Sequence, residues 1–62
     1  MTIEQILARI EVLKAEEAIC AAVVMDRSKA GTREWRAAGS RSVAITCEIA
    51  GLNTLACEAA LQ

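Results

Sequence analysis

The chain has 62 residues, with seven basic and eight acidic side chains, one aromatic residue, no histidine and no proline. A chain of this length forms one domain (residues 1–62), and it buries only about 60% of the surface that its unfolded form exposes. Cores of this size supply about 3–5 kcal/mol, so a disulfide, a metal or self-association is expected to add stability.

The cysteine content argues against a disulfide framework or a metal centre. Three cysteines cannot all pair within one chain, and none lies in a CxxC arrangement, so Cys20, Cys47 and Cys57 are interpreted as apolar residues in a reducing compartment. The usual nitrogen ligand of zinc is missing because there is no histidine. We expect no metal and no cofactor, and Cys20 and Cys47 to approach only as packing partners. Self-association is then the remaining source of stability.

The chain ends and the apolar runs predict a cytoplasmic protein without a membrane contact. The N-terminus, MTIEQILARIEVLK, lacks the basic-then-apolar order of a signal peptide. The longest apolar run, AICAAVVM at 18–25, has eight residues, whereas about 20 are needed to span a bilayer.

The first half of the chain predicts a long helix over about 3–28. Thr2 and Gln5 form a T-x-x-Q capping box at its start. One face carries apolar residues at helical spacing, namely Ile3, Ile6, Leu7, Ile10 and Leu13. A second apolar set, Val12, Ile19 and Val23, projects from nearly the opposite side. A helix that is apolar on two sides is expected to be covered on two sides.

The second half predicts a turn over about 29–32 and a helix over about 33–60. Gly31 is the expected helix stop, with Arg27 and Lys29 near the negative end of the first helix, and Thr32 is the expected N-cap of the second. A heptad seam with spacings of three and four is formed by Trp35, Ala38, Ser42, Ile45, Ile49, Leu52, Ala56 and Ala59. Val43, Cys47 and Ala50 are expected to broaden this apolar arc. Gly51 is a weak point, where a separate short helix capped by Asn53 or Thr54 is the alternative to one continuous helix.

These elements predict an all-α fold, an antiparallel two-helix hairpin in which the two helices are of equal length and end together. Two such hairpins are expected to pair into a four-helix homodimer. A strand reading of VVM or SVAIT is the alternative, but it lacks the turn chemistry of a small sheet. The residues expected in the hairpin core or the dimer contact are Ile6, Ile10, Val12, Leu13, Ile19, Val23, Ala38, Ile45, Ile49 and Leu52.

The side chains predict no enzyme. Histidine, tyrosine, a GxSxG elbow and a phosphate-binding glycine loop are all missing from the sequence. Glu16 and Glu17 are adjacent and point about 100° apart on a helix, so they do not share a proton. Glu17 lies near the seam, and it is interpreted either as a buried acid or, more plainly, as an edge residue or a partner for an arginine.

The tract from Asp26 to Arg41 stands out, because it contains five basic and two acidic residues in a chain of net charge −1. Tryptophan and arginine are enriched in binding hot spots, so this tract is the predicted partner-binding surface. Its residues are Arg27, Lys29, Arg33, Trp35, Arg36 and Arg41. Trp35 has two interpretations, as a plug that closes the end of the bundle or as an exposed contact.

Two classes of partner fit a basic surface. The first is a host protein, which the dimer would meet with two copies of the surface. The second is nucleic acid, whose phosphates would be held by the Arg27–Arg41 end. The slightly acidic chain and the mixed charges around Glu34 and Glu48 favour a protein over a phosphate backbone.

The short chain, the long first helix, the turn entering T-R-E-W-R-A-A-G and the second helix resemble the anti-quorum-sensing proteins of Pseudomonas phages. The resemblance implies a helical-hairpin homodimer in the cytoplasm of a bacterial host. Such a dimer sequesters a LuxR-type transcriptional activator and keeps it from DNA, and some members also inhibit a pilus-assembly ATPase. Another phage anti-defence protein, of the anti-CRISPR type, is the alternative of similar size.

Overall fold

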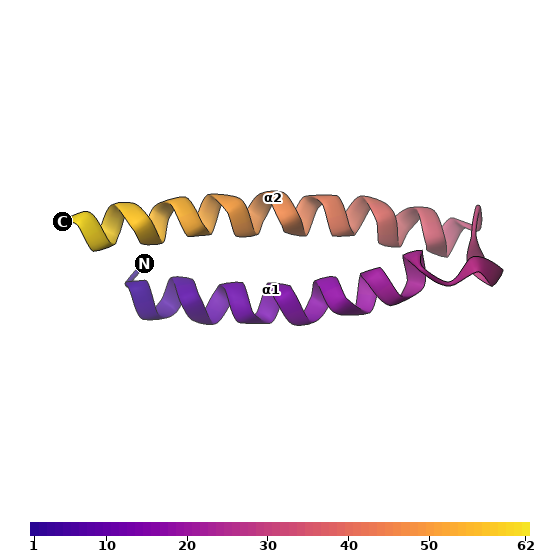
Figure 1. Ribbon diagram of the computed structural model, residues 1–62, viewed down its shortest axis with the longest axis horizontal. Helices are drawn as coiled ribbons and strands as arrows, with labels where there is room; N and C mark the ends of the chain where they lie inside the picture. The colour runs from indigo at the N-terminus through magenta and orange to yellow at the C-terminus, as the bar shows by residue number, and fades with distance from the viewer.

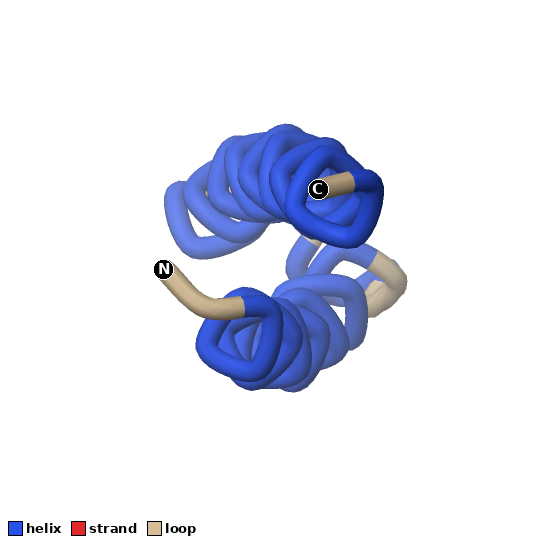
Figure 2. The backbone as a smooth tube through the Cα atoms, turned by 90° about the vertical axis from the view of Figure 1, so that its left-hand side faces the viewer, coloured by secondary structure: helices blue, strands red, loops and turns tan.

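The computed structural model describes all 62 residues and consists of two long helices joined by a short turn. α1 spans Ile3–Val24, a 3-10 turn η1 spans Arg27–Lys29, and α2 spans Arg33–Leu61. The two helices run antiparallel, side by side along their length, in a molecule of 48 × 14 × 14 Å (Figures 1 and 2). The predicted all-α hairpin is confirmed, and the segments VVM and SVAIT contain no strand.

The start of α1 is built as its capping box predicts. Thr2 Oγ1 accepts a hydrogen bond from Gln5 N at 3.1 Å, and Gln5 Oε1 accepts one from Thr2 N at 2.9 Å. Two of the backbone donors that a helix start leaves unsatisfied therefore have partners.

The end of α1 differs from the prediction, because the helix stops at Val24 and not near residue 28. The Asp26 carboxylate accepts hydrogen bonds from Ser28 N at 3.0 Å and Ser28 Oγ at 2.6 Å. Local side-chain bonds of this kind compete with helix continuation, and here they start η1. Arg27 and Lys29 therefore lie in η1, outside the last turn of α1, which contains no basic residue. Gly31 reverses the chain after η1 with φ +82°, a backbone conformation that favours glycine.

α2 begins at its predicted cap and continues through Gly51. Thr32 Oγ1 accepts a hydrogen bond from Trp35 N at 3.2 Å. Thr54 does not cap a new helix, since its hydroxyl donates to Ala50 O at 3.1 Å inside the continuous helix. The prediction of level ends is wrong: α2 has 29 residues against 22 in α1, and its C-terminal end extends past the start of α1 (Figure 1).

The core is a single row of apolar contacts between the helices. It contains Ile6, Ile10 and Leu13 from α1 with Ile45 and Leu52 from α2, and Cys20, Ile49 and Ala56 pack against it. All eight predicted seam positions of α2 are buried or half-buried, including Ala38 and Trp35. Val12 and Ile19 are exposed and Val23 is half-buried, so they lie outside the hairpin core. Val43, Cys47 and Ala50 are exposed too, and they do not broaden the buried arc.

α2 is also long and apolar enough, by length and composition, to cross a membrane, which the count of uninterrupted apolar residues did not detect. The core helix of a protein that never enters a membrane passes the same test when it is mostly buried, but only 6% of the apolar window of α2 is buried in the hairpin. In this hairpin α2 packs on α1, and its Arg41 and Glu48 form ion pairs with Glu16 and Arg9.

Candidate functional site

Trp35 connects the two helices at the turn end of the hairpin. Its indole Nε1 donates a hydrogen bond to Val24 O at 3.0 Å, and the side chain is half-buried. Val24 is the last residue of α1, where carbonyl groups have no partner within the helix. The indole therefore satisfies a carbonyl at the end of α1, but Trp35 is not among the side chains that pack against the buried core. The hydrogen bond gives the side chain a structural role, and its partial exposure leaves the contact interpretation open to test.

Arg41 is held by α1. Its Nε lies 2.7 Å from Glu16 Oε1 and its Nη2 lies 3.0 Å from Glu16 Oε2, a two-pronged pair between the helices. The Arg41 hydrogen bond, followed by its charge, holds the pKa of Glu16 below its ordinary value, and the same bond raises the pKa of Arg41. Of the three interpretations of Glu17, the arginine partner is wrong, because Arg41 pairs with Glu16, and Glu17 is half-buried. Glu17 instead accepts a hydrogen bond from Thr46 Oγ1 at 3.4 Å.

Two other basic side chains are also engaged within the turn end. Lys29 Nζ lies 3.3 Å from Glu34 Oε1. Arg36 Nη2 donates to Gly31 O at 3.2 Å, which steadies the turn while leaving the rest of the guanidinium exposed. The Asp26 carboxyl has a pKa below its ordinary value because it accepts two hydrogen bonds from Ser28, with Lys29 nearby.

Arg27 and Arg33 are exposed and make neither an ion pair nor a side-chain hydrogen bond. Arg33 and Arg36 line a shallow, open hollow on one face of α2 together with Ala37 and Ser40. Ala37 and Ser40 were not predicted as site residues, although positions four and seven after Arg33 share its helical face. The structure thus leaves Arg27, Arg33 and Arg36 as an exposed group, which we call the arginine group.

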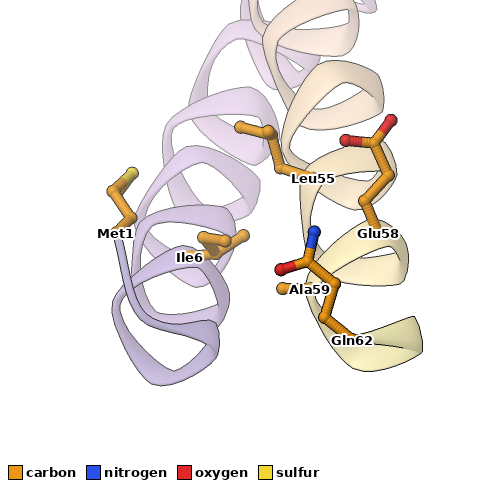
Figure 3. A pocket seen from close by; sticks show the side chains of 6 residues that line it. All are labelled: Met1, Ile6, Leu55, Glu58, Ala59 and Gln62. Atoms are coloured by element: carbon orange, nitrogen blue, oxygen red, sulfur yellow. The ribbon is translucent and has the colours of Figure 1, made fainter.

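A second concavity lies at the other end of the hairpin, where α2 extends past α1 (Figure 3). It encloses about 220 Å³ and is lined by Met1, Ile6, Leu55, Glu58, Ala59 and Gln62. Pockets for small molecules usually measure about 300–1,000 Å³. Its single carboxylate has no base, nucleophile or cation beside it, so the lining supplies no recognisable chemistry.

The remaining reactive side chains do not converge. All three cysteines are free, with Cys20 packed on the core and Cys47 and Cys57 exposed. Cys20 and Cys47 therefore do not form a buried thiol pair, because Cys47 faces away from α1. No three His, Cys, Asp or Glu side chains are close enough together to hold a metal ion.

No family model matches this chain, and neither a curated protein nor a solved structure matches it.

Proposed function

We propose that this protein is a non-enzymatic inhibitor that binds a bacterial regulatory protein through the arginine group at the turn end of a homodimer. The observation that carries the proposal is the state of these side chains. Arg27 and Arg33 have no partner in the hairpin, and Arg33 and Arg36 border a shallow, open hollow together with Ala37 and Ser40. Arginine is one of the residue types enriched in binding hot spots.

The charges of the turn end support a protein partner over nucleic acid. Lys29 and Arg41, two of the five basic side chains, are already paired with Glu34 and Glu16. The three arginines without an ion pair offer few phosphate contacts, and non-specific affinity for DNA grows with the number of such contacts. Exposed carboxylates at the same end would also repel a phosphate backbone.

The thin core supports the homodimer. Five of 62 residues are buried, and the hairpin exposes 4567 Å². A compact monomer of 6.6 kDa exposes about 3,900 Å², so the hairpin exceeds it by about 700 Å². A stable interface buries about 800 Å² per partner. A second copy of the chain would therefore cover an area close to this excess.

The resemblance to anti-quorum-sensing proteins supplies the class of target, a LuxR-type activator that is kept from its DNA. The test is a gel-shift assay with a purified activator of this class, its DNA site and the hairpin protein. We expect the protein to abolish the activator–DNA shift without shifting DNA alone. Arg33→Glu should weaken this inhibition about 30-fold or more, as loss of a hot spot does.

Lys14→Glu is the matched control. It makes the same change in net charge on an exposed lysine of α1 that pairs only with Glu11. This variant should inhibit as well as the native chain. Equal inhibition by Arg33→Glu would remove the arginine group from the contact, and a shift of free DNA by the hairpin alone would favour a nucleic-acid regulator.

A further inference from the structure

The face of α2 turned away from α1 carries a second heptad pattern, distinct from the seam that packs on α1. Six residues follow one another at spacings of four, three, four, three and four, and all six are exposed. We call them the outer stripe: Val43, Cys47, Ala50, Thr54, Cys57 and Leu61. At 1.5 Å per residue the stripe is about 27 Å long. Its two ends carry the largest apolar side chains, Val43 and Leu61, which are 65% and 88% exposed.

The outer stripe can be covered by an apolar surface at little electrostatic cost. It contains no charged residue. Its only hydroxyl, on Thr54, already donates to Ala50 O at 3.1 Å, so burial would not strand a donor. Arg41 and Glu48 are turned toward α1 by their ion pairs with Glu16 and Arg9, and Glu58, four residues after Thr54 and three before Leu61, is the one charged residue that borders the stripe.

We propose that the outer stripe is the homodimer contact, in which α2 packs antiparallel against α2 of a second copy. This inference rests on the homodimer of the proposed function and assigns its face and register. When the stripe is reversed about Leu52, Val43 meets Leu61 of the partner subunit, Cys47 meets Cys57 of the partner subunit, and Ala50 meets Thr54 of the partner subunit. Each layer thus joins uncharged side chains of small or medium size.

Self-complementarity favours a second copy as the occupant. A two-fold symmetric contact repeats every pairing twice. If Val43 of one subunit touches Leu61 of the partner subunit, then Leu61 of the first subunit touches Val43 of the partner subunit. The outer stripe meets this condition in all six positions. Cys47 and Cys57 lie at equal distances from the centre of the stripe. A second copy needs this symmetry for the two thiols to meet, whereas an unrelated partner does not.

The apolar residues of α1 are less suitable for a dry contact. Val12 is three residues from Arg9 and four from Glu16, so it lies beside the α1 members of both interhelical ion pairs. A partner placed over Val12 and Ile19 would have to desolvate these charges, which is costly. A dimer in which the second copy covers this side of α1, as the sequence predicted, is therefore the alternative that the test below distinguishes.

The register places the two arginine groups at opposite ends of the dimer. Arg36 lies sixteen residues before Leu52, so the two copies of Arg36 would be about 48 Å apart along the helix axis. Such a dimer would contact two separate sites on a large or dimeric target.

The thiols provide the test. Oxidised glutathione is added to the native protein at low concentration, and covalent dimers are counted on a non-reducing gel. A Cys47 thiolate displaces one glutathione and forms a mixed disulfide. Cys57 of the partner subunit then displaces the second glutathione and closes the cross-link. We expect covalent dimers from the native chain and from Cys20→Ser.

The single variants decide the register. Cys47→Ser alone and Cys57→Ser alone should each fail to cross-link, because neither homodimer contains a facing pair of thiols. An equilibrated mixture of the two variants should regain cross-linking, since the mixed dimer contains one such pair. Cross-linking by either variant alone would overturn the register.

Charge substitutions locate the face without relying on thiols. In reducing buffer, Val43→Asp should weaken the dimer about 100-fold or more, as sedimentation measures it, while circular dichroism remains helical. Val12→Asp should leave the dimer intact. Dissociation by Val12→Asp but not by Val43→Asp would move the contact to α1 and overturn the proposal. A native chain that is monomeric in the same buffer would instead overturn the homodimer itself.

Discussion

Trp35 and Val24 hold the turn end of the hairpin together, through a 3.0 Å hydrogen bond from the indole Nε1 to the backbone carbonyl. The bond joins the first turn of α2 to the last residue of α1. The only aromatic ring of the chain therefore has a structural role at the edge of the proposed binding surface. Its polar atom is occupied inside the hairpin, so a partner would meet the exposed edge of the ring.

Trp35→Phe should lower the free energy of unfolding by about 0.5–1.5 kcal/mol, the net value of one hydrogen bond. Phenylalanine keeps an aromatic ring at this position, but Val24 O loses its donor. Urea unfolding followed by circular dichroism measures the change. A variant as stable as the native chain would mean that the hydrogen bond adds nothing to the free energy of unfolding.

Ile45→Asp should unfold the hairpin. Ile45 is completely buried, and an unpaired charge there costs several kcal/mol, comparable with the about 3–5 kcal/mol that a core of this size supplies. Ile49→Asp, at a half-buried position beside the core, should also destabilise it, by a smaller amount. Far-ultraviolet circular dichroism at 25 °C measures the lost helix.

Ala44→Asp is the control for Ile45→Asp, because it places the same charge on the neighbouring exposed position of α2. It should remain helical. If both variants unfolded, the loss would come from aspartate in the helix and not from charge burial.

The stability of the hairpin should fall in acid through Glu16. Its pKa is lowered in the folded state by the Arg41 hydrogen bond, so the ionised form is favoured by folding. The stabilisation is complete above about 4.3, the ordinary glutamate pKa, and it disappears as the pH falls through the lowered folded value. Melting temperatures measured from pH 7 to pH 2 should show this decline.

Glu16→Gln should flatten that part of the pH profile, whereas Glu58→Gln, which removes a carboxylate without an ion pair, should not. Identical profiles for the native chain and Glu16→Gln would show that the pair does not contribute to acid sensitivity.

Gly31→Ala and Gly39→Ala should shift stability in opposite directions. Gly31 has φ +82°, so alanine there is strained and should cost about 1 kcal/mol or more. Gly39 is inside α2, and an added Cβ would meet nothing within 4 Å, so alanine there should gain about 0.8–1.0 kcal/mol. Thermal unfolding of both variants measures the difference, and a loss at Gly39 would reveal a contact on that side of α2.

The helices and their buried faces could be predicted from the sequence because they depend on local periodicity. The caps at Thr2 and Thr32 are local signals, and they are present as predicted. The eight heptad positions from Trp35 to Ala59 are all at least half-buried, since a seam of this spacing turns one face of a helix toward its neighbour.

The tertiary structure decided the ends and the pairings. α1 stops at Val24 because Asp26 bonds to Ser28, a competition that periodicity does not reveal. Arg41, which was predicted to belong to the partner-binding tract, forms an ion pair with Glu16, because the register of the two helices brings these side chains together. Periodicity places a residue on a face of its own helix, whereas only the packing of one helix on the other determines which of those faces is covered and which charges remain free.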